Sequence, residues 1–186
     1  MDNIKTYCDY IKSFTPAEKN IHREYHDKQY GFNLNDDNEL FGRLLLEINQ
    51  AGLSWATILK KQDNFRKAFH NYNIDKISKY KDKDIERLLN DAGIIRNKLK
   101  INAAIFNAQR IKEIQKEHGS FIAWLDLHVK YSKEEWVKLF KTTFKFTGGE
   151  IVNEFLMSTG YLPGAHVKEC PVYKIILKQK PKWQNR

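Results

Sequence analysis

The stretch that decides the fold is LEINQAGLSW, residues 46–55. It closes an amphipathic helix whose apolar residues recur at helical spacing and whose flank carries Glu47. Gly52 stops this helix, and Trp55 follows at once. Because a carboxylate at the edge of a core is costly to desolvate without a hydrogen-bond partner, the pattern predicts a pocket for a flat polar ligand. The alternative is a half-solvated Glu47 paired with a lysine.

The other periodic segments of the chain are also helical. A helix is expected to open at Ser54 or Trp55, and another to run from a cap at Asp82 to a left-handed cap at Gly93. Further helices are expected over residues 97–116, after Ser120, after the capping box of Ser132 and Glu135, and over residues 151–156 up to Gly160. No segment alternates with a period of two residues. The sequence therefore predicts an all-α, compact helical domain over residues 1–186, with two packed helical lobes as the alternative.

The composition is that of a folded protein of ordinary size. Its 186 residues are 41% hydrophobic and 13% aromatic, which is enough to bury a core. No apolar run approaches the roughly 18 to 20 residues of a membrane span, and the first residues lack the apolar centre of a secretory signal. We therefore expect a cytoplasmic protein without a membrane partner, and a monomer.

The net charge of +9 is unevenly distributed. Residues 1–95 hold 15 Lys and Arg against 15 Asp and Glu, whereas residues 96–186 hold 17 against 8. A basic half with aromatic residues among its charges favours a polyanionic partner, and nucleic acid is the natural candidate. The alternative is a lysine-rich surface that serves solubility alone.

The segment DAGIIRNK, residues 91–98, predicts a tight turn between two helices. Such a turn aims free backbone N–H groups of the second helix outward, beside Arg96, Lys98 and Lys100. This arrangement could bind the phosphates of a duplex without reading its bases. Ordinary antiparallel helix pairs also turn on glycine, so the motif alone leaves both interpretations open.

Each end of the chain offers one cysteine and one histidine. Cys8 and His26 lie near the amino terminus, and His166 precedes Cys170 near the carboxyl terminus. A set of two cysteines and two histidines suits a closed structural zinc site that would staple the two ends and leave no position open for catalysis. The spacing from Cys8 to His26 matches no common zinc finger, so two reduced thiols remain the alternative.

Six blocks of sequence stand out in order along the chain. They are YHDKQYG, EINQAGLSW, ILKKQDNFRKAF, DAGIIR with Lys100-Ile101, FKFTGG and HVKEC. Together they resemble the DNA-3-methyladenine glycosylase I family in order and spacing, over most of the chain from Cys8 to Cys170. The resemblance implies a helical fold with a helix-hairpin-helix element, a structural zinc that joins the termini, and removal of 3-methyladenine from alkylated double-stranded DNA.

The resemblance also implies a role for each matching residue. Glu47 corresponds to the acid that hydrogen-bonds the extruded base, Tyr25 and Trp55 to aromatics that stack on it, and Tyr10 to a further pocket aromatic. Gly52 and Leu53 correspond to the loop that enters the gap left in the duplex, with Gln50 beside it. The zinc ligands would be Cys8, His26, His166 and Cys170.

These roles fit the chemistry of the lesion. N3 methylation makes adenine cationic, so Trp55 would add a cation–π interaction and Glu47 would favour the charge. A cationic purine leaves readily, and we expect attack by water on the sugar without a covalent lysine intermediate. No aspartate corresponds to the one that assists other helix-hairpin-helix glycosylases, and Asp126 belongs to no matching block.

Five departures from the family pattern bear on the range of lesions, the first of which is a longer stretch between Cys8 and His26. His22 stands at a pocket-aromatic position, Tyr30 replaces a tryptophan, and Asn97 and Leu99 replace residues after the hairpin.

Two other functions remain open. A non-catalytic protein could recognise alkylated DNA with the same face, and only release of a free base would distinguish it from an enzyme. A zinc-stapled helical interaction module would leave Glu47, Tyr25 and Trp55 without a role.

Overall fold

A computed structural model of the chain describes residues 6–15 and 20–185. These residues form helices joined by short turns and contain no strand, which confirms the predicted all-α class. The elements, in chain order, are α1 (Tyr7–Lys12), α2 (Ile21–Lys28), α3 (Asp37–Gln50), α4 (Trp55–Ala68), η1 (His70–Tyr72), α5 (Ile74–Ile77), α6 (Asp82–Asn90), α7 (Lys98–His118), α8 (Phe121–Leu127), α9 (Lys133–Thr143), α10 (Gly149–Ser158), α11 (Pro171–Lys178) and η2 (Lys182–Asn185).

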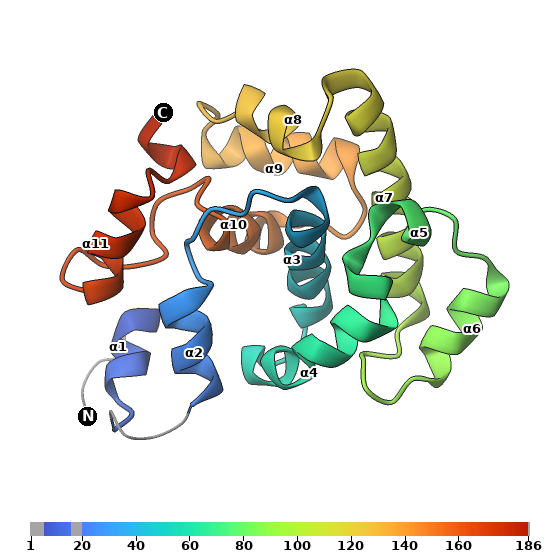
Figure 1. The fold of residues 1–186 in the computed structure, drawn as a ribbon, viewed down its shortest axis with the longest axis horizontal. Coiled ribbons are helices and arrows are strands. Elements are labelled where there is room, and N and C mark those ends of the chain that lie inside the picture. Colours follow the sequence, from blue (N-terminus) through green and yellow to red (C-terminus); the bar gives the residue numbers. More distant parts are fainter. Residues whose placement is uncertain (1–5, 16–19, 186) are drawn as a thin grey trace.

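Helix α3 runs through the middle of the molecule, with α4, α7 and α10 packed around it (Figure 1). Asp36 caps its first turn by accepting a hydrogen bond from the Glu39 N–H at 3.0 Å. Every residue from Leu40 to Asn49 is buried, so α3 is enclosed on all sides rather than on a single apolar stripe. The polar side chains of this segment are therefore held inside the protein.

Helix starts agree well with the capping residues read from the sequence. Ser54 caps α4, Ser120 caps α8, and Ser132 with Glu135 forms the expected capping box at α9. The predicted cap at Asp82 is wrong by one residue, because Lys81 is the N-cap and Asp84 accepts a hydrogen bond from its N–H at 3.1 Å.

Gly93 does not form the predicted left-handed cap. Helix α6 ends at Asn90, the backbone of Asp91 is extended, and the φ of Gly93 is not positive. A glycine fits there for a different reason. A β-carbon at residue 93 would lie 2.9 Å from the Asp91 Oδ1 and 3.1 Å from the Asn64 β-carbon. Close packing of the turn against α4, rather than backbone conformation, therefore favours glycine at this position.

The two ends of the chain meet on one side of the molecule. Helices α1 and α2 lie beside α11, as the blue and red ribbons of Figure 1 show. A small buried cluster of Cys8, Cys170, Val172 and Ile176 joins these segments. Within the described ranges, no helix is both long and apolar enough to cross a membrane.

Candidate active site and metal centre

A cavity of about 310 Å³ opens where α1, α2, α3, α4 and α10 approach one another. Rings and carboxyl groups dominate its lining. Volumes of this order suit small-molecule sites. The residues that line it are Tyr7, Tyr25, Tyr30, Glu47, Gln50, Trp55 and Glu154.

Glu47 enters this cavity from the last turn of α3. Only 4% of the residue is exposed, and among the described residues no hydrogen bond to its carboxyl group is found. The alternative of a half-solvated Glu47 paired with a lysine is therefore wrong. Burial raises the pKa of Glu47 to about 8; Arg43 opposes this shift and Glu154 adds to it. The cavity thus contains a buried acid that can accept a hydrogen bond from a ligand or form an ion pair with a positively charged one.

Two of the predicted aromatics stand beside this acid. The ring centroids of Tyr25 and Trp55 are 5.1 Å apart, with an interplanar angle of 66°. Tyr25 is held in place by the Arg43 guanidinium, which donates a hydrogen bond of 3.1 Å to its hydroxyl oxygen. Trp55 is the first residue of α4, directly after the Ser54 cap. The structure therefore brings together Glu47, Tyr25 and Trp55, as the sequence interpretation requires.

Tyr10 does not line the cavity, and Tyr7 occupies that position instead. The Tyr7 hydroxyl lies 3.0 Å from the His22 Nδ1, and the Tyr10 ring packs against the rings of Tyr7 and Phe14. The two tyrosines are three residues apart in α1, so they share a face of this short helix and the sequence did not distinguish them. His22 contributes by holding Tyr7 rather than by lining the cavity.

Sequence reasoning also missed Glu154, which comes from α10. The Tyr30 hydroxyl donates a hydrogen bond of 3.1 Å to its Oε2. Burial raises the pKa of Glu154, while the bond from Tyr30 opposes the shift. The sequence offered only the observation that Glu154 is a polar residue on a helix with many apolar residues. Its contact with Tyr30 could not be predicted, because residues 124 positions apart leave no local pattern.

The loop that follows α3 is exposed at its tip. Gly52 adopts a φ of +83°, which favours glycine, and 38% of Leu53 is exposed. The Gln50 side-chain amide donates to the Leu53 carbonyl at 3.1 Å and supports the loop from within. An apolar side chain is thereby presented beside the mouth of the cavity.

Lys100 holds this loop instead of facing solvent. Its ammonium donates to the carbonyl of Asn49 at 3.0 Å and to that of Ala51 at 2.8 Å, and only 7% of the residue is exposed. Desolvation lowers its pKa. Lys100 does not reach out to a phosphate as expected, because its ammonium group is already hydrogen-bonded to the Asn49 and Ala51 carbonyls at the end of α3.

The turn between α6 and α7 exposes Arg96 and Lys98, as predicted. The expectation of free N–H groups on the following helix holds only in part. Asn97 caps α7, and its Oδ1 accepts from the N–H groups of Leu99 at 3.0 Å and Lys100 at 3.1 Å. The amides of residues 95, 96 and 98 make no hydrogen bond within the described part of the chain.

The four predicted ligands converge where the chain ends meet. The ligand atoms of Cys8, His26, His166 and Cys170 all lie within 4.8 Å of one another, and all four residues are buried. The four sulfur–nitrogen distances are 3.4, 3.5, 3.6 and 3.7 Å. Zinc bonds of about 2.3 Å to sulfur and about 2.0 Å to nitrogen, at tetrahedral angles, place such atoms about 3.5 Å apart. The cluster could therefore hold a metal ion.

The outer nitrogens of both histidines are also engaged. The His26 Nδ1 lies 2.7 Å from the Asp27 Oδ1, and the His166 Nε2 lies 2.8 Å from the Tyr30 carbonyl oxygen. Such partners orient the imidazoles of metal sites and fix which nitrogen faces the metal. Tyr30 therefore joins the two sites: its carbonyl oxygen contacts His166 of the cysteine–histidine cluster, and Tyr30 also lines the cavity that contains Glu47.

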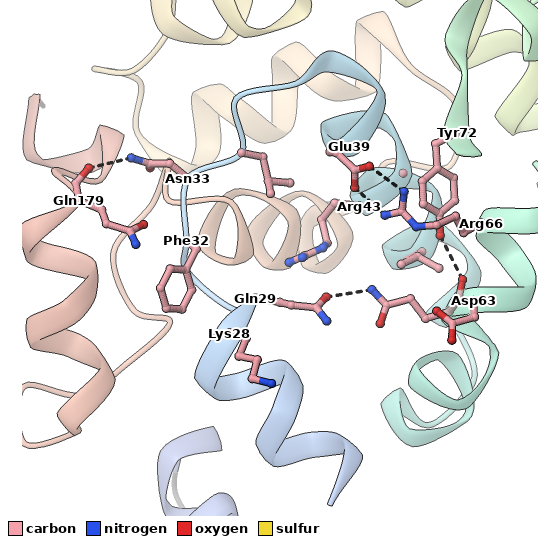
Figure 2. A pocket seen from close by; sticks show the side chains of 14 residues that line it. Lys28, Gln29, Phe32, Asn33, Glu39, Arg43, Asp63, Arg66, Tyr72 and Gln179 are labelled. Atoms are coloured by element: carbon pink, nitrogen blue, oxygen red, sulfur yellow. Dashed lines mark hydrogen bonds and ion pairs between the residues drawn. The ribbon is translucent and has the colours of Figure 1, made fainter. Parts of the chain in front are cut away.

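A second cavity, of about 530 Å³, has Arg43 in its lining (Figure 2). Several of its polar side chains are paired with one another. Arg66 forms a two-pronged ion pair with Glu39 at 2.7 Å for each contact, and the Gln62 amide donates to Gln29 at 2.9 Å. The smaller cavity is the better candidate site, because it contains the buried acid without a partner.

Comparison with known proteins agrees with these observations. Residues 15–137 match the family described as methyladenine glycosylase. The chain is 33% identical to DNA-3-methyladenine glycosylase 1 of Escherichia coli K12 over 80% of this chain and 89% of that protein. It is 34% identical to DNA-3-methyladenine glycosylase of Haemophilus influenzae over 90% of this chain and 98% of that protein. The crystal structure of a variant 3-methyladenine DNA glycosylase I in complex with 3-methyladenine aligns with a TM-score of 0.76 and 31% identity, covering 83% of this chain and 94% of that chain.

Proposed function

The chain belongs to the methyladenine glycosylase family, and from this membership we propose that it excises 3-methyladenine from alkylated DNA. The reaction is hydrolysis of the N-glycosidic bond, which leaves an abasic site. One observation supports this function above the others. Glu47 is a buried acid without a hydrogen-bond partner among the described residues, and it lines the same cavity as the Tyr25 and Trp55 rings.

Access to the base requires that it leave the duplex. A base inside the stack is unreachable, and extrusion costs a few kcal/mol, less for a lesion that pairs poorly. In our proposal Trp55 and Tyr25 hold the extruded purine by its faces. Leu53, presented by the Gly52 turn, fills the gap left in the duplex, and Gln50 keeps the loop in shape.

The positive charge of the lesion gives the site its selectivity. The pKa of about 8 for the Glu47 carboxyl group applies to the cavity without a ligand. A cation beside Glu47 favours ionisation of this group. The purine ring also gains a cation–π interaction with Trp55. Neutral adenine offers neither, so binding energy is directed at the alkylated base.

The chemical step needs little acid catalysis. The bond between the sugar carbon and the purine nitrogen breaks, and its electron pair neutralises the departing base. Water then adds to the sugar carbon and releases one proton. No amine nucleophile is required, and Lys100, the buried lysine near the site, has its ammonium engaged by two carbonyl oxygens. We therefore propose a monofunctional glycosylase.

The basic turn between α6 and α7 is the proposed anchor for the DNA backbone. Arg96 and Lys98 are exposed there, and the backbone amides of residues 95, 96 and 98 are available for phosphate oxygens. This is the role of a helix-hairpin-helix element. It positions the duplex without reading its sequence.

We further propose that the Cys8, His26, His166 and Cys170 cluster holds structural zinc. Its sulfur–nitrogen distances match tetrahedral coordination, and both histidines have outer partners. When bound, zinc would contribute folding free energy by joining the chain ends, and four protein ligands leave no position for substrate. A monomeric state and a cytoplasmic location remain predictions.

Release of a free base tests the function. Methylated duplex DNA is incubated with the protein, and the soluble bases are separated by chromatography. We expect 3-methyladenine to appear and the abasic strand to stay intact until treated with alkali. Tight binding of the alkylated DNA without any released base would instead support the non-catalytic alternative.

A further inference from the structure

The candidate cavity contains a second acid that neither the sequence motifs nor the proposed mechanism uses. Glu154 lines the cavity from α10, as Glu47 and Gln50 do from α3. Its Oε2 accepts a hydrogen bond from the Tyr30 hydroxyl, and the Asn153 side chain also donates to this carboxyl group. A carboxylate offers about four acceptor positions, so Glu154 keeps acceptor positions open in the same cavity as Glu47, whose carboxyl group has no hydrogen-bond partner among the described residues.

Three of the donors around the cavity are already engaged within the protein. The Tyr30 hydroxyl donates to Glu154, the Gln50 amide donates to the Leu53 carbonyl, and the Tyr7 hydroxyl donates to the His22 carbonyl. A ligand with hydrogen-bond donors and positive charge fits this arrangement. A ligand edge with lone pairs facing the two acids would be repelled.

We propose that Glu154 is a specificity-determining residue that acts as a second acceptor for the extruded base and favours cationic purines with N–H donors on the edge that enters the cavity. The inference rests on the proposed function. It adds a second residue that discriminates by charge, because neutral adenine presents ring nitrogens with lone pairs beside its amino group, whereas the alkylated purine brings a net positive charge.

The charged and titratable groups around the two acids agree with this assignment. Glu150 and Lys133 act on Glu154 with opposite sign, and Arg43 and Glu154 act on Glu47 with opposite sign. Like charges in one cavity disfavour ionisation of both acids, and a bound cation removes that penalty. The positive charge on the purine decreases as the glycosidic bond breaks. Glu154 should therefore act on binding more than on the chemical step.

The direct test replaces Glu154 with glutamine and measures excision of 3-methyladenine from methylated DNA. Glutamine has the shape of glutamate but no charge, so the variant replaces a hydrogen bond to a charged group with a hydrogen bond to a neutral one. We expect KM to rise about tenfold while kcat stays within about twofold. Glu117→Gln is the matched control, since it makes the same change in net charge at an exposed position of α7 outside the cavity lining.

A second variant separates this role from a merely structural one. Tyr30→Phe keeps the ring and removes the donor to Glu154, so the pKa of Glu154 should rise and base binding should shift to higher pH. The KM for methylated duplex DNA, taken relative to that of the unmodified protein at the same pH, should be raised at pH 7 and recover as the pH rises in Tyr30→Phe. It should stay raised over the same pH range in Glu154→Gln.

Three results would overturn the proposal. They are a Glu154→Gln variant with the KM of Glu117→Gln, a loss confined to kcat, and a Tyr30→Phe variant whose KM has the pH dependence of the unmodified protein. If the unmodified protein releases no base, yet binds methylated duplex DNA more tightly than Glu154→Gln does, then the proposed glycosylase activity fails and the role of Glu154 stands.

Discussion

Replacing Glu47 with glutamine should stabilise the protein while it impairs function. Glu47 is only 4% exposed, and the pKa of its carboxyl group is raised from 4.5 to about 8. In the folded protein the proton is therefore favoured. The stabilising contribution of the protonated form is complete below the unfolded pKa, and it is lost as pH rises towards the folded value of about 8. A glutamine has no such pH dependence.

The size of the effect follows from the shift. A difference of 3 to 4 pKa units corresponds to about 5 kcal/mol well above pH 8, and linkage places about 2 to 3 kcal/mol of this loss between pH 5 and pH 7. For a chain of this length, 1 kcal/mol moves the melting temperature by about 2–4 °C. The melting temperature of Glu47→Gln minus that of the unmodified protein should therefore rise by roughly 5 to 10 °C from pH 5 to pH 7.

The assay is denaturant unfolding and thermal melting of both proteins at pH 5, 7 and 9. Both proteins have the same histidines and cysteines, so the titration of these residues cancels in the difference. Glu117→Gln, at an exposed position, should show no such trend. A stability difference between Glu47→Gln and the unmodified protein that stays flat from pH 5 to pH 9 would refute the desolvated acid.

Four further predictions concern the rest of the site. Trp55→Ala should slow excision of 3-methyladenine by about tenfold or more at limiting DNA, because a stacking surface is lost; an unchanged rate would remove Trp55 from the pocket. Lys100→Met keeps the side-chain stem and frees the Asn49 and Ala51 carbonyls, so hydrogen exchange in residues 51–54 should accelerate and excision should fall; unchanged exchange would contradict its role in holding the loop. Metal analysis should find about one zinc per chain, and Cys170→Ser should lose the metal and melt at lower temperature; equal stability without metal would refute the staple. DNA affinity should fall steeply as salt rises, whereas a flat response would argue against phosphate contacts.

Local signals predicted the helices well. Caps at Ser54, Ser120 and Ser132 depend on hydrogen bonds within one helical turn, so they can be read from neighbouring residues. Gly93 was misread because two different constraints, positive φ and close packing, both select glycine. The φ of Gly93 and the short distances to Asp91 and Asn64 distinguish them, and none of these can be read from the local sequence.

Contacts distant in sequence were the part that local patterns could not supply. Lys100 looked like a phosphate ligand because it lies in a basic turn, yet its partners are carbonyls about 50 positions earlier. Glu154 looked like one polar residue on an apolar helix, and its partner Tyr30 lies 124 positions away. The resemblance to a family identified Glu47, Tyr25 and Trp55, but it carried no information on residues outside the shared motifs.

The most direct test of the central claim compares excision by the unmodified protein and by Glu47→Gln. Both are incubated at limiting concentration with the same methylated duplex DNA, and released 3-methyladenine is followed with time. We expect the unmodified protein to release the base and Glu47→Gln to do so about 10- to 100-fold more slowly, the range set by loss of one hydrogen bond to a charged group. Equal rates from two folded proteins would contradict the role assigned to the buried acid.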